Sequence, residues 1–289
     1  MSFYEQYISY LDLLFKQHSL EDIDYLNVSS LPNGMHSFKL YEIKHTSKEE
    51  ELDISSRAII DSGLIDATLY VSPCTAGTDR YDFHISNQRN TNDCMIALLG
   101  TLQKHFDITS DAMQEISVLS QMPILPENSG YRSLYFVGVE RQDNIPCACK
   151  LHFRTRMSVN YKDCFMDEMY LAYITKHLPR QFDAICSATR QALRAGHLFL
   201  AGVDCCNGNI NKRKLYIRIT DIYAVADVIR DISDCSPEYK NFFLKLFDAV
   251  NSDGRMFIDA FALCFSDGTL SSINYYLATR SSGNENISC

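Results

Sequence analysis

The chain has 289 residues and a formal net charge of −9, with 36 acidic side chains against 27 basic ones. Hydrophobic residues make up 46% and charged residues 22%, which is ordinary for a globular protein with a core. This length suits either two domains or one large barrel. Nucleic acids and anionic membrane surfaces favour positively charged proteins, so we expect neither as a partner.

The cysteines and the N-terminus bear on the compartment. The chain has 11 cysteines, an odd number, and Cys147, Cys149, Cys205 and Cys206 lack the paired spacing of a zinc site. The first residues carry no basic segment typical of a signal peptide, and no apolar run is long enough to span a membrane. We therefore expect a cytoplasmic protein with reduced thiols, and a monomer.

Helices and strands alternate in blocks along the chain. Apolar residues at helical spacing predict a first helix, and we expect a helical N-terminal segment over about residues 1–30. No Pro, Gly or Ser-rich linker divides the chain, so we expect one domain over 1–289, with a disordered tail at about 281–289. The pattern predicts strands at 35–44, 67–71, 80–85, 134–140, 150–156, 198–204, 214–218, 256–265 and 270–277, and helices at 92–106, 110–122, 161–176, 181–195, 222–232 and 239–250.

Two of these hairpins repeat each other. Residues 134–140 and 150–154 match residues 198–204 and 214–218 at a constant offset of 64 positions. In each second strand, cations and polar rings alternate with apolar residues, so they fall on opposite faces. The polar faces carry Lys150, His152 and Arg154 in the first copy and Lys214, Tyr216 and Arg218 in the second, while the apolar faces carry Leu151, Phe153, Leu215 and Ile217.

Recurring hairpins with helices between them can close an antiparallel barrel, which removes the exposed edges of an open sheet. The class we expect is α+β, with helices outside the apolar faces and one cationic layer in the lumen. Aligning the other hairpins adds Arg80 to that layer and puts Asn274 and Tyr276 in the corresponding place, with Tyr275 on the opposite parity. The plainer alternative is a solvated sheet face. Random variation of surface residues, however, would rarely produce the same arrangement at matching positions of two hairpins.

The strand Lys-Leu-His-Phe-Arg-Thr-Arg at 150–156, the hairpin at 198–218 and the closing Ile-Asn-Tyr-Tyr at 273–276 resemble the ABBA-type aromatic prenyltransferases. Among these, the chain looks closest to the cyanobactin prenyltransferases, which modify ribosomal peptides. The likeness covers residues from about 60 to 280. It implies a ten-stranded antiparallel barrel, built from repeated α-β-β-α units and ringed by helices.

The resemblance also implies a reaction. An isoprenyl group, dimethylallyl or geranyl, would pass from its diphosphate to a side chain of a peptide, often a macrocyclic one, with Mg²⁺ accompanying the diphosphate. Asp66 would be the general base, with Glu140 and Asp204 as alternatives that fit hairpin tips better. Diphosphate binding would fall to Arg80, Lys150, His152, Arg154, Lys214, Tyr216, Arg218, Asn274 and Tyr276, shielding of the carbocation to Tyr70, Tyr216, Tyr275 and Tyr276, and the prenyl pocket to Phe136 and Leu200, whose bulk favours a C5 donor.

Two alternative functions stay open. The acceptor could be a small aromatic metabolite instead of a peptide, or the barrel could bind diphosphates without turnover. The chain contains no phosphate loop, dinucleotide fingerprint, nucleophile elbow or His-Glu-x-x-His, nor the Asp-rich motif of helical prenyl synthases.

Overall fold

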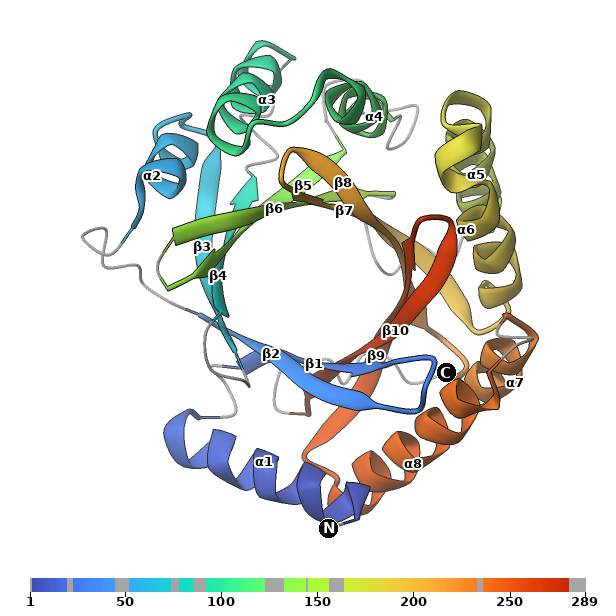
Figure 1. Cartoon of the computed structure of the whole chain (residues 1–289). Helices are drawn as coiled ribbons and strands as arrows, with labels where there is room; N and C mark the ends of the chain where they lie inside the picture. The colour runs from blue at the N-terminus through green and yellow to red at the C-terminus, as the bar shows by residue number, and fades with distance from the viewer. Residues whose placement is uncertain are drawn as a thin grey trace.

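The computed structural model describes residues 2–19, 23–44, 52–73, 78–85, 92–122, 133–143, 145–155, 164–232 and 236–280. In these residues, ten antiparallel strands form a sheet that closes on itself, with eight helices around it (Figure 1). The elements are α1 (Phe3–Gln17), β1 (Ile23–Ser30), β2 (His36–Lys44), α2 (Ile54–Ile60), β3 (Ile65–Pro73), β4 (Thr78–Ile85), α3 (Asn92–Phe106), α4 (Ser110–Ser120), β5 (Leu134–Gln142), β6 (Ile145–Arg154), α5 (Cys164–His177), α6 (Pro179–Ala192), β7 (Gly196–Cys206), β8 (Asn209–Ile219), α7 (Ile222–Ile232), α8 (Pro237–Asp253), β9 (Met256–Ser266) and β10 (Thr269–Thr279).

Strand β1 joins the two ends of the sheet. It pairs with β2 on one side and with β10 on the other, with Leu26 opposite Leu277 and Val28 opposite Tyr275. The remaining strands pair in chain order from β2 to β10. The predicted α+β class, with an antiparallel sheet curled inside a layer of helices, is confirmed.

The N-terminus corrects one prediction. Helix α1 starts with a capping box, in which the Ser2 side chain accepts a hydrogen bond from the Glu5 backbone, and it ends at Gln17. Residues 23–30, expected to be helical, form β1 instead. Here Leu26 and Val28 are buried while Ser29 bonds to Asn274, and that partner lies 245 positions along the chain. Helical periodicity near the start of the chain carries no information about such a distant partner.

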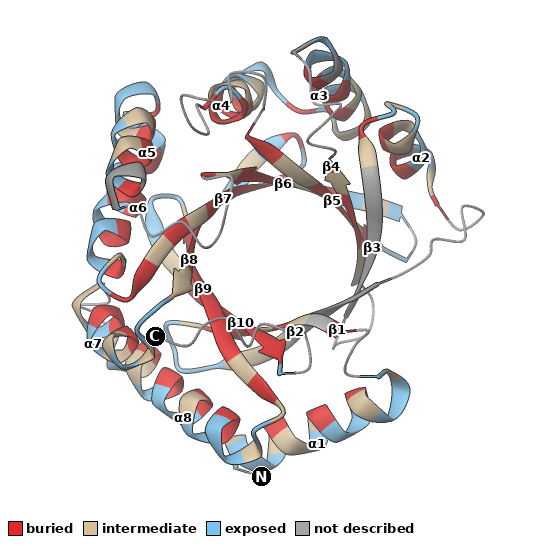
Figure 2. Ribbon diagram, turned by 180° about the vertical axis from the view of Figure 1, so that it is seen from behind, coloured by how far each residue is buried: buried red, intermediate tan, exposed pale blue. Residues whose placement is uncertain are grey.

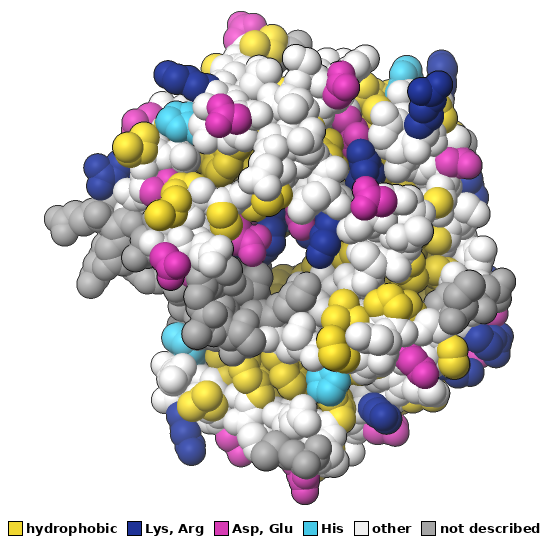
Figure 3. All heavy atoms as spheres, viewed as in Figure 1, with side chains coloured by type: hydrophobic (Ala, Val, Ile, Leu, Met, Phe, Trp, Pro, Cys, Tyr) yellow, Lys and Arg dark blue, Asp and Glu magenta, His cyan; other side chains and the backbone are white. Residues whose placement is uncertain are grey.

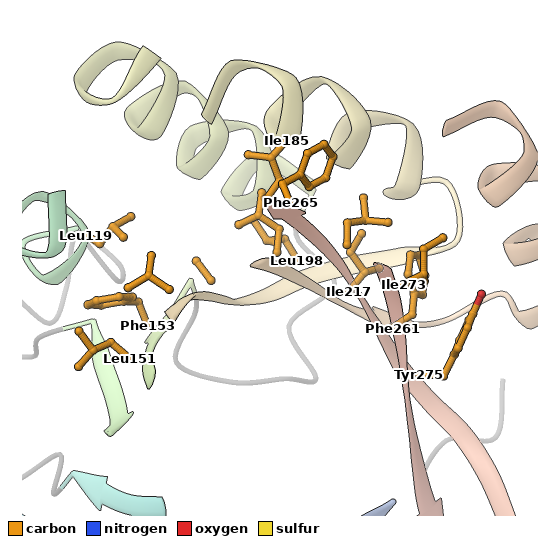
Figure 4. Close-up of a cluster of buried hydrophobic side chains, with 14 of the residues drawn as sticks. Leu119, Leu151, Phe153, Ile185, Leu198, Ile217, Phe261, Phe265, Ile273 and Tyr275 are labelled. Atoms are coloured by element: carbon orange, nitrogen blue, oxygen red, sulfur yellow. The ribbon is translucent and has the colours of Figure 1, made fainter. Parts of the chain in front are cut away.

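The apolar faces of the strands form the outer core, as predicted. Leu151, Phe153, Leu215 and Ile217 are each completely buried. Figure 4 shows three of them, Leu151, Phe153 and Ile217, in one cluster with Leu119 of α4 and Ile185 of α6. Figure 2 shows the same division for the helices, whose buried residues face the sheet and whose exposed residues face outward. The polar faces of the strands therefore line the lumen.

Candidate active site in the barrel lumen

The lumen gathers most of the predicted site residues. In the space-filling view the barrel is hollowed at its centre, and basic and acidic side chains lie around the opening (Figure 3). Strand register places the predicted residues of neighbouring strands on this inner face: Lys150 is opposite Gly138, Tyr216 is opposite Ala262, and Asn274 is opposite Ser29. The inner face carries Arg80 of β4, Lys150, His152 and Arg154 of β6, Lys214, Tyr216 and Arg218 of β8, and Asn274 and Tyr276 of β10.

The lysines of both repeats are paired with carboxylates. Lys150 forms an ion pair with Glu140, and Lys214 Nζ lies 2.6 Å from Asp204 Oδ2. These are the same interaction in the two copies, since each partner lies 64 positions from its counterpart. The expectation that Glu140 and Asp204 lie at hairpin tips is therefore wrong. They lie on the inner faces of β5 and β7, because they share strand parity with Gly138 and Gly202 and precede the tips.

Arg80 follows the same rule, since its guanidinium lies 2.7 Å from Asp82 on the same strand. Sequence reasoning missed all three carboxylates as partners of the cations. A signal was present for two of them, because Glu140 and Asp204 are part of the repeat itself.

Charge is retained in this layer despite burial. Burial alone would raise the pKa of Asp204, but Lys214 and Lys150 hold the pKa of its carboxyl well below its usual range. Burial likewise lowers the pKa of Lys214, and Asp204 more than offsets this, so the pKa of the lysine is raised. Both groups are therefore ionised at neutral pH.

Aromatic rings lie beside the charged layer. His152 Nε2 lies 2.7 Å from the hydroxyl oxygen of Tyr216, and the ring of Phe136 stacks on His152 with centroids 3.9 Å apart. Tyr276 follows, with its ring centroid 5.5 Å from that of Tyr216. Leu200 packs against Tyr216 in a small apolar cluster inside the lumen, separate from the outer core. The two predicted prenyl-pocket residues, Phe136 and Leu200, thus lie next to the predicted shielding rings.

His152 is a neutral group in this setting. Burial, followed by the nearby Lys214 and Arg80, lowers its pKa well below 6.5. Its Nδ1 is buried and has no hydrogen-bond partner among the residues that the structure describes. His152 can therefore contribute a hydrogen bond to a ligand, but not a positive charge.

The two repeat glycines leave room for these groups. A Cβ on Gly202 would lie 3.2 Å from ring atoms of His152 and of Tyr216. A Cβ on Gly138 would lie 2.6 Å from Asp82 Oδ1. Each glycine is opposite a lysine of the next strand, Gly138 with Lys150 and Gly202 with Lys214. The glycines of the repeat are thus explained by close approach of side chains across the lumen.

The predicted single cationic layer is in fact two layers. Arg154 and Arg218 follow Lys150 and Lys214 by four residues, which is about 13 Å along a strand at roughly 3.3 Å per residue. Arg154 lies over the ring of Tyr135 at 3.9 Å, and Arg218 over the ring of Phe199 at 5.2 Å. We call Lys150, Lys214 and their carboxylates the lysine layer, and Arg154, Arg218 and their rings the arginine layer.

One predicted shielding residue lies outside the lumen. Tyr275 is fully buried, with its ring centroid 5.9 Å from that of Phe242 and 5.8 Å from that of Phe243, both on α8. Figure 4 draws it in the outer cluster. The alternation of β10 explains the correction, because Asn274 and Tyr276 occupy the inner face and Tyr275 must point outward.

Two further predictions, Asp66 and Tyr70, lie on β3, and their side chains are outside the described residues. So is the tail at 281–289. The roles given to Asp66 and Tyr70 stay predictions.

The predicted Mg²⁺ has no evident set of protein ligands. Within the described ranges, no group of three or more His, Cys, Asp or Glu side chains could hold a metal ion. The carboxylates next to the lumen cations, Asp82, Glu140, Asp204 and Asp259, are each paired with one of these cations. We therefore assign no step to a metal.

Comparison with known proteins supports the fold. No family model matches the chain, and no curated protein sequence matches it. Solved structures do match: PriB in a binary complex with product diphosphate (TM-score 0.52, 11% identity, 89% of this chain and 79% of that chain) and 5-dimethylallyltryptophan synthase from Streptomyces coelicolor (0.53, 13%, 90% and 81%). A third is 6-dimethylallyltryptophan synthase from Micromonospora olivasterospora with DMASPP and Trp (0.51, 12%, 89% and 81%).

These identities are low, so the comparisons bear on fold alone. The chain has the fold of ABBA-type aromatic prenyltransferases. The closer likeness to the cyanobactin branch stays a prediction. Among the helices in the described part of the chain, none is long and apolar enough to cross a membrane.

Proposed function

We propose that this protein is a prenyltransferase that moves a dimethylallyl group, or a geranyl group, from its diphosphate to a side chain of a ribosomal peptide. The observation that carries the proposal is the lumen itself, in which the lysine layer lies directly beside the rings of His152, Tyr216 and Tyr276. The fold shared with prenyltransferases, one of them with product diphosphate bound, supports the same reaction.

The chemistry suits this arrangement. As the C–O bond of the donor breaks, negative charge grows on the diphosphate and positive charge on the allyl group. Lys150, Lys214 and Arg80 stabilise the leaving group, because fixed cations in a site that excludes bulk water lower the barrier. The faces of Tyr216 and Tyr276 stabilise the allyl cation through their π electrons and keep water away from it. Asp66 takes the proton that the acceptor loses.

The ion pairs add a requirement to this mechanism. Lys150 and Lys214 are bound to Glu140 and Asp204 before any donor arrives. A diphosphate must therefore compete with these carboxylates for the ammonium groups. Glu140 is the weaker competitor, since its side chain is 27% exposed whereas that of Asp204 is 10% exposed. Donor affinity is thus set by the exchange of one anion for another.

The test pairs two variants of one ion pair, Lys150→Ala and Glu140→Gln. Wild-type protein and each variant are incubated with linear and macrocyclic peptides and with dimethylallyl or geranyl diphosphate, and products are followed by mass spectrometry. We expect Lys150→Ala to lower turnover roughly 100- to 1000-fold, since it removes a cation that acts on the leaving group. Glu140→Gln removes a competing charge at constant size, so inorganic diphosphate should bind more tightly in calorimetry.

Three outcomes would redirect the proposal. If Lys150→Ala turned over substrate at the wild-type rate, the lysine layer would be rejected as the diphosphate site. Transfer to free phenols or indoles but to no peptide would favour a small aromatic metabolite as the acceptor. Diphosphate binding with no transfer to any acceptor would favour a silent barrel.

A further inference from the structure

A pair of thiols lies at the end of the lumen nearest the lysine layer. Cys206 of β7 shares strand parity with Asp204, so it belongs to the inner face, and it is opposite Ala148 of β6. Cys147 precedes Ala148 in the sequence. Cys147 is exposed, Cys206 is half-buried, and both are free thiols. Two thiols that solvent can reach therefore lie on neighbouring strands.

A β-bulge turns Cys147 away from the outer core. The pairing of β5 with β6 shifts register after Glu140, which leaves Cys147 as an extra residue. A bulge re-aims the side chain at such a position. The Cys147 thiol donates to the backbone oxygen of Glu140 at 3.4 Å. Burial, then Glu140 and Cys206, raise the pKa of this thiol, and Lys150 lowers it. Three side chains of the inner face thus act on Cys147.

Strand geometry allows the two thiols to join. Directly opposite residues of an antiparallel pair have Cα atoms about 4.5 to 5.5 Å apart, and each residue advances about 3.3 Å along its strand. Cys147 and Cys206 are one residue out of register, so their Cα atoms are about 6 Å apart. Disulfides span Cα separations of roughly 4.4 to 6.8 Å. The pair therefore needs no large movement of the backbone to form a disulfide.

A second pair of cysteines on the same strands provides a comparison. Cys149 is directly opposite Cys205, on the outer faces of β6 and β7. Both side chains are buried, and burial raises the pKa of both thiols, that of Cys205 to about 12. Oxidation requires a thiolate that the oxidant can reach. We therefore expect this outer pair to stay reduced under conditions in which the inner pair reacts.

We propose that Cys147 and Cys206 are a redox-active pair, which a hydroperoxide converts into a disulfide that joins β6 to β7 beside the lysine layer. The Cys147 thiolate attacks the peroxide and becomes a sulfenic acid, while the O–O bond breaks and the alkoxide takes up the proton that the thiol lost. Cys206 then attacks that sulfur as a thiolate, which forms the S–S bond and releases hydroxide, and its own proton converts the hydroxide to water. This inference does not depend on the proposed function.

The test maps the disulfide. Fully reduced protein is treated with hydrogen peroxide at mildly alkaline pH, remaining thiols are alkylated, and the unreduced digest is analysed by mass spectrometry. We expect a cross-linked peptide pair joining Cys147 to Cys206, which a dithiol reductant separates. A link that closes a loop of this length should also raise the melting temperature of the oxidised protein by about 3 to 7 °C over the reduced protein.

The variants Cys147→Ser and Cys206→Ser should each lack both the cross-link and the rise in melting temperature. Cys186→Ser is the matched control, because it removes a buried thiol of α6 and should keep both. Absence of the link in the wild type, or a link of either cysteine to another thiol, overturns the proposal. So does a link between Cys149 and Cys205 in its place. A Cys147–Cys206 link without a rise in melting temperature would show that the disulfide does not hold β6 against β7, and would also overturn it.

Discussion

At the scale of single residues, His152 shows how the lumen changes the chemistry of a side chain. A histidine between Lys150 and Arg154 in the sequence invites the view that it adds positive charge to an anion site. Burial and the cations around it keep the ring neutral, and its hydrogen bond goes to Tyr216. In the proposed reaction His152 therefore orients Tyr216 and offers one further hydrogen bond through Nδ1.

The neutral state of His152 has a consequence for stability against pH. Its folded pKa is lowered below 6.5, so between 6.5 and that lower value the unfolded chain binds a proton that the folded chain does not. The contribution of His152 to the free energy of unfolding should therefore fall as pH decreases below about 6.5, by at most about 1.4 kcal/mol per pH unit. Between pH 7.5 and 5.5, the free energy of unfolding measured in urea should fall less for His152→Gln than for the wild type. An equal fall in the two proteins would mean that His152 ionises in the folded state. The control is His177→Gln, which changes an exposed histidine on α5.

At the scale of secondary structure, the repeated hairpin is the unit that builds the site. Each copy contributes a glycine, an acidic residue, and a lysine that forms an ion pair with that acidic residue. Each also contributes a polar ring and an arginine that lies over the aromatic residue of a β-bulge. The glycine is essential to this unit, because the strand opposite brings large side chains directly over it.

Gly202→Ala tests that packing. A Cβ only 3.2 Å from the rings of His152 and Tyr216 must displace one of them, and we expect a loss of about 1 to 3 kcal/mol in the free energy of unfolding. Gly100→Ala in α3 is the control, since its Cβ would meet nothing within 4 Å. It should be stabilising by about 0.5 to 1 kcal/mol, because alanine favours the helix. Equal stability of both variants and the wild type would show that the rings move at no cost.

At the scale of the whole molecule, closure depends on β1. This strand comes near the N-terminus and pairs with β10, at the other end of the described chain. The Ser29 hydroxyl donates to Asn274 Oδ1 at 2.8 Å inside the lumen, so the closing seam also fixes a predicted site residue.

Amide hydrogen exchange measures this closure directly. Because β1 is bonded on both sides, we expect its amides to be protected to within about tenfold of those of β9, which lies between β8 and β10. Rapid exchange limited to β1 and the facing side of β10 would mean that the ring opens at this seam.

Local alternation and recurrence in the sequence were enough to predict part of this structure. A period of two assigns Lys150, His152 and Arg154 to one face, and the offset of 64 repeats the assignment in β8. Since these patterns need no knowledge of partner strands, the antiparallel units, the inner face and most of the lumen residues could be predicted. The same parity placed Tyr275 outside, and the prediction that it shields the carbocation failed because it followed a family motif and set that parity aside.

Which side chains meet in the lumen could not be predicted from these patterns. Ion pairs of Lys150 with Glu140 and of Lys214 with Asp204 depend on register across strands, and the stacking of Arg154 and Arg218 depends on bulges that shift register by one residue. The strand nature of residues 23–30 depends on β10, more than 240 positions away. The ion pairs and the stacked rings each depend on the register within one hairpin, whereas the pairing of β1 with β10 depends on the closure of the barrel. Local periodicity contains no record of either.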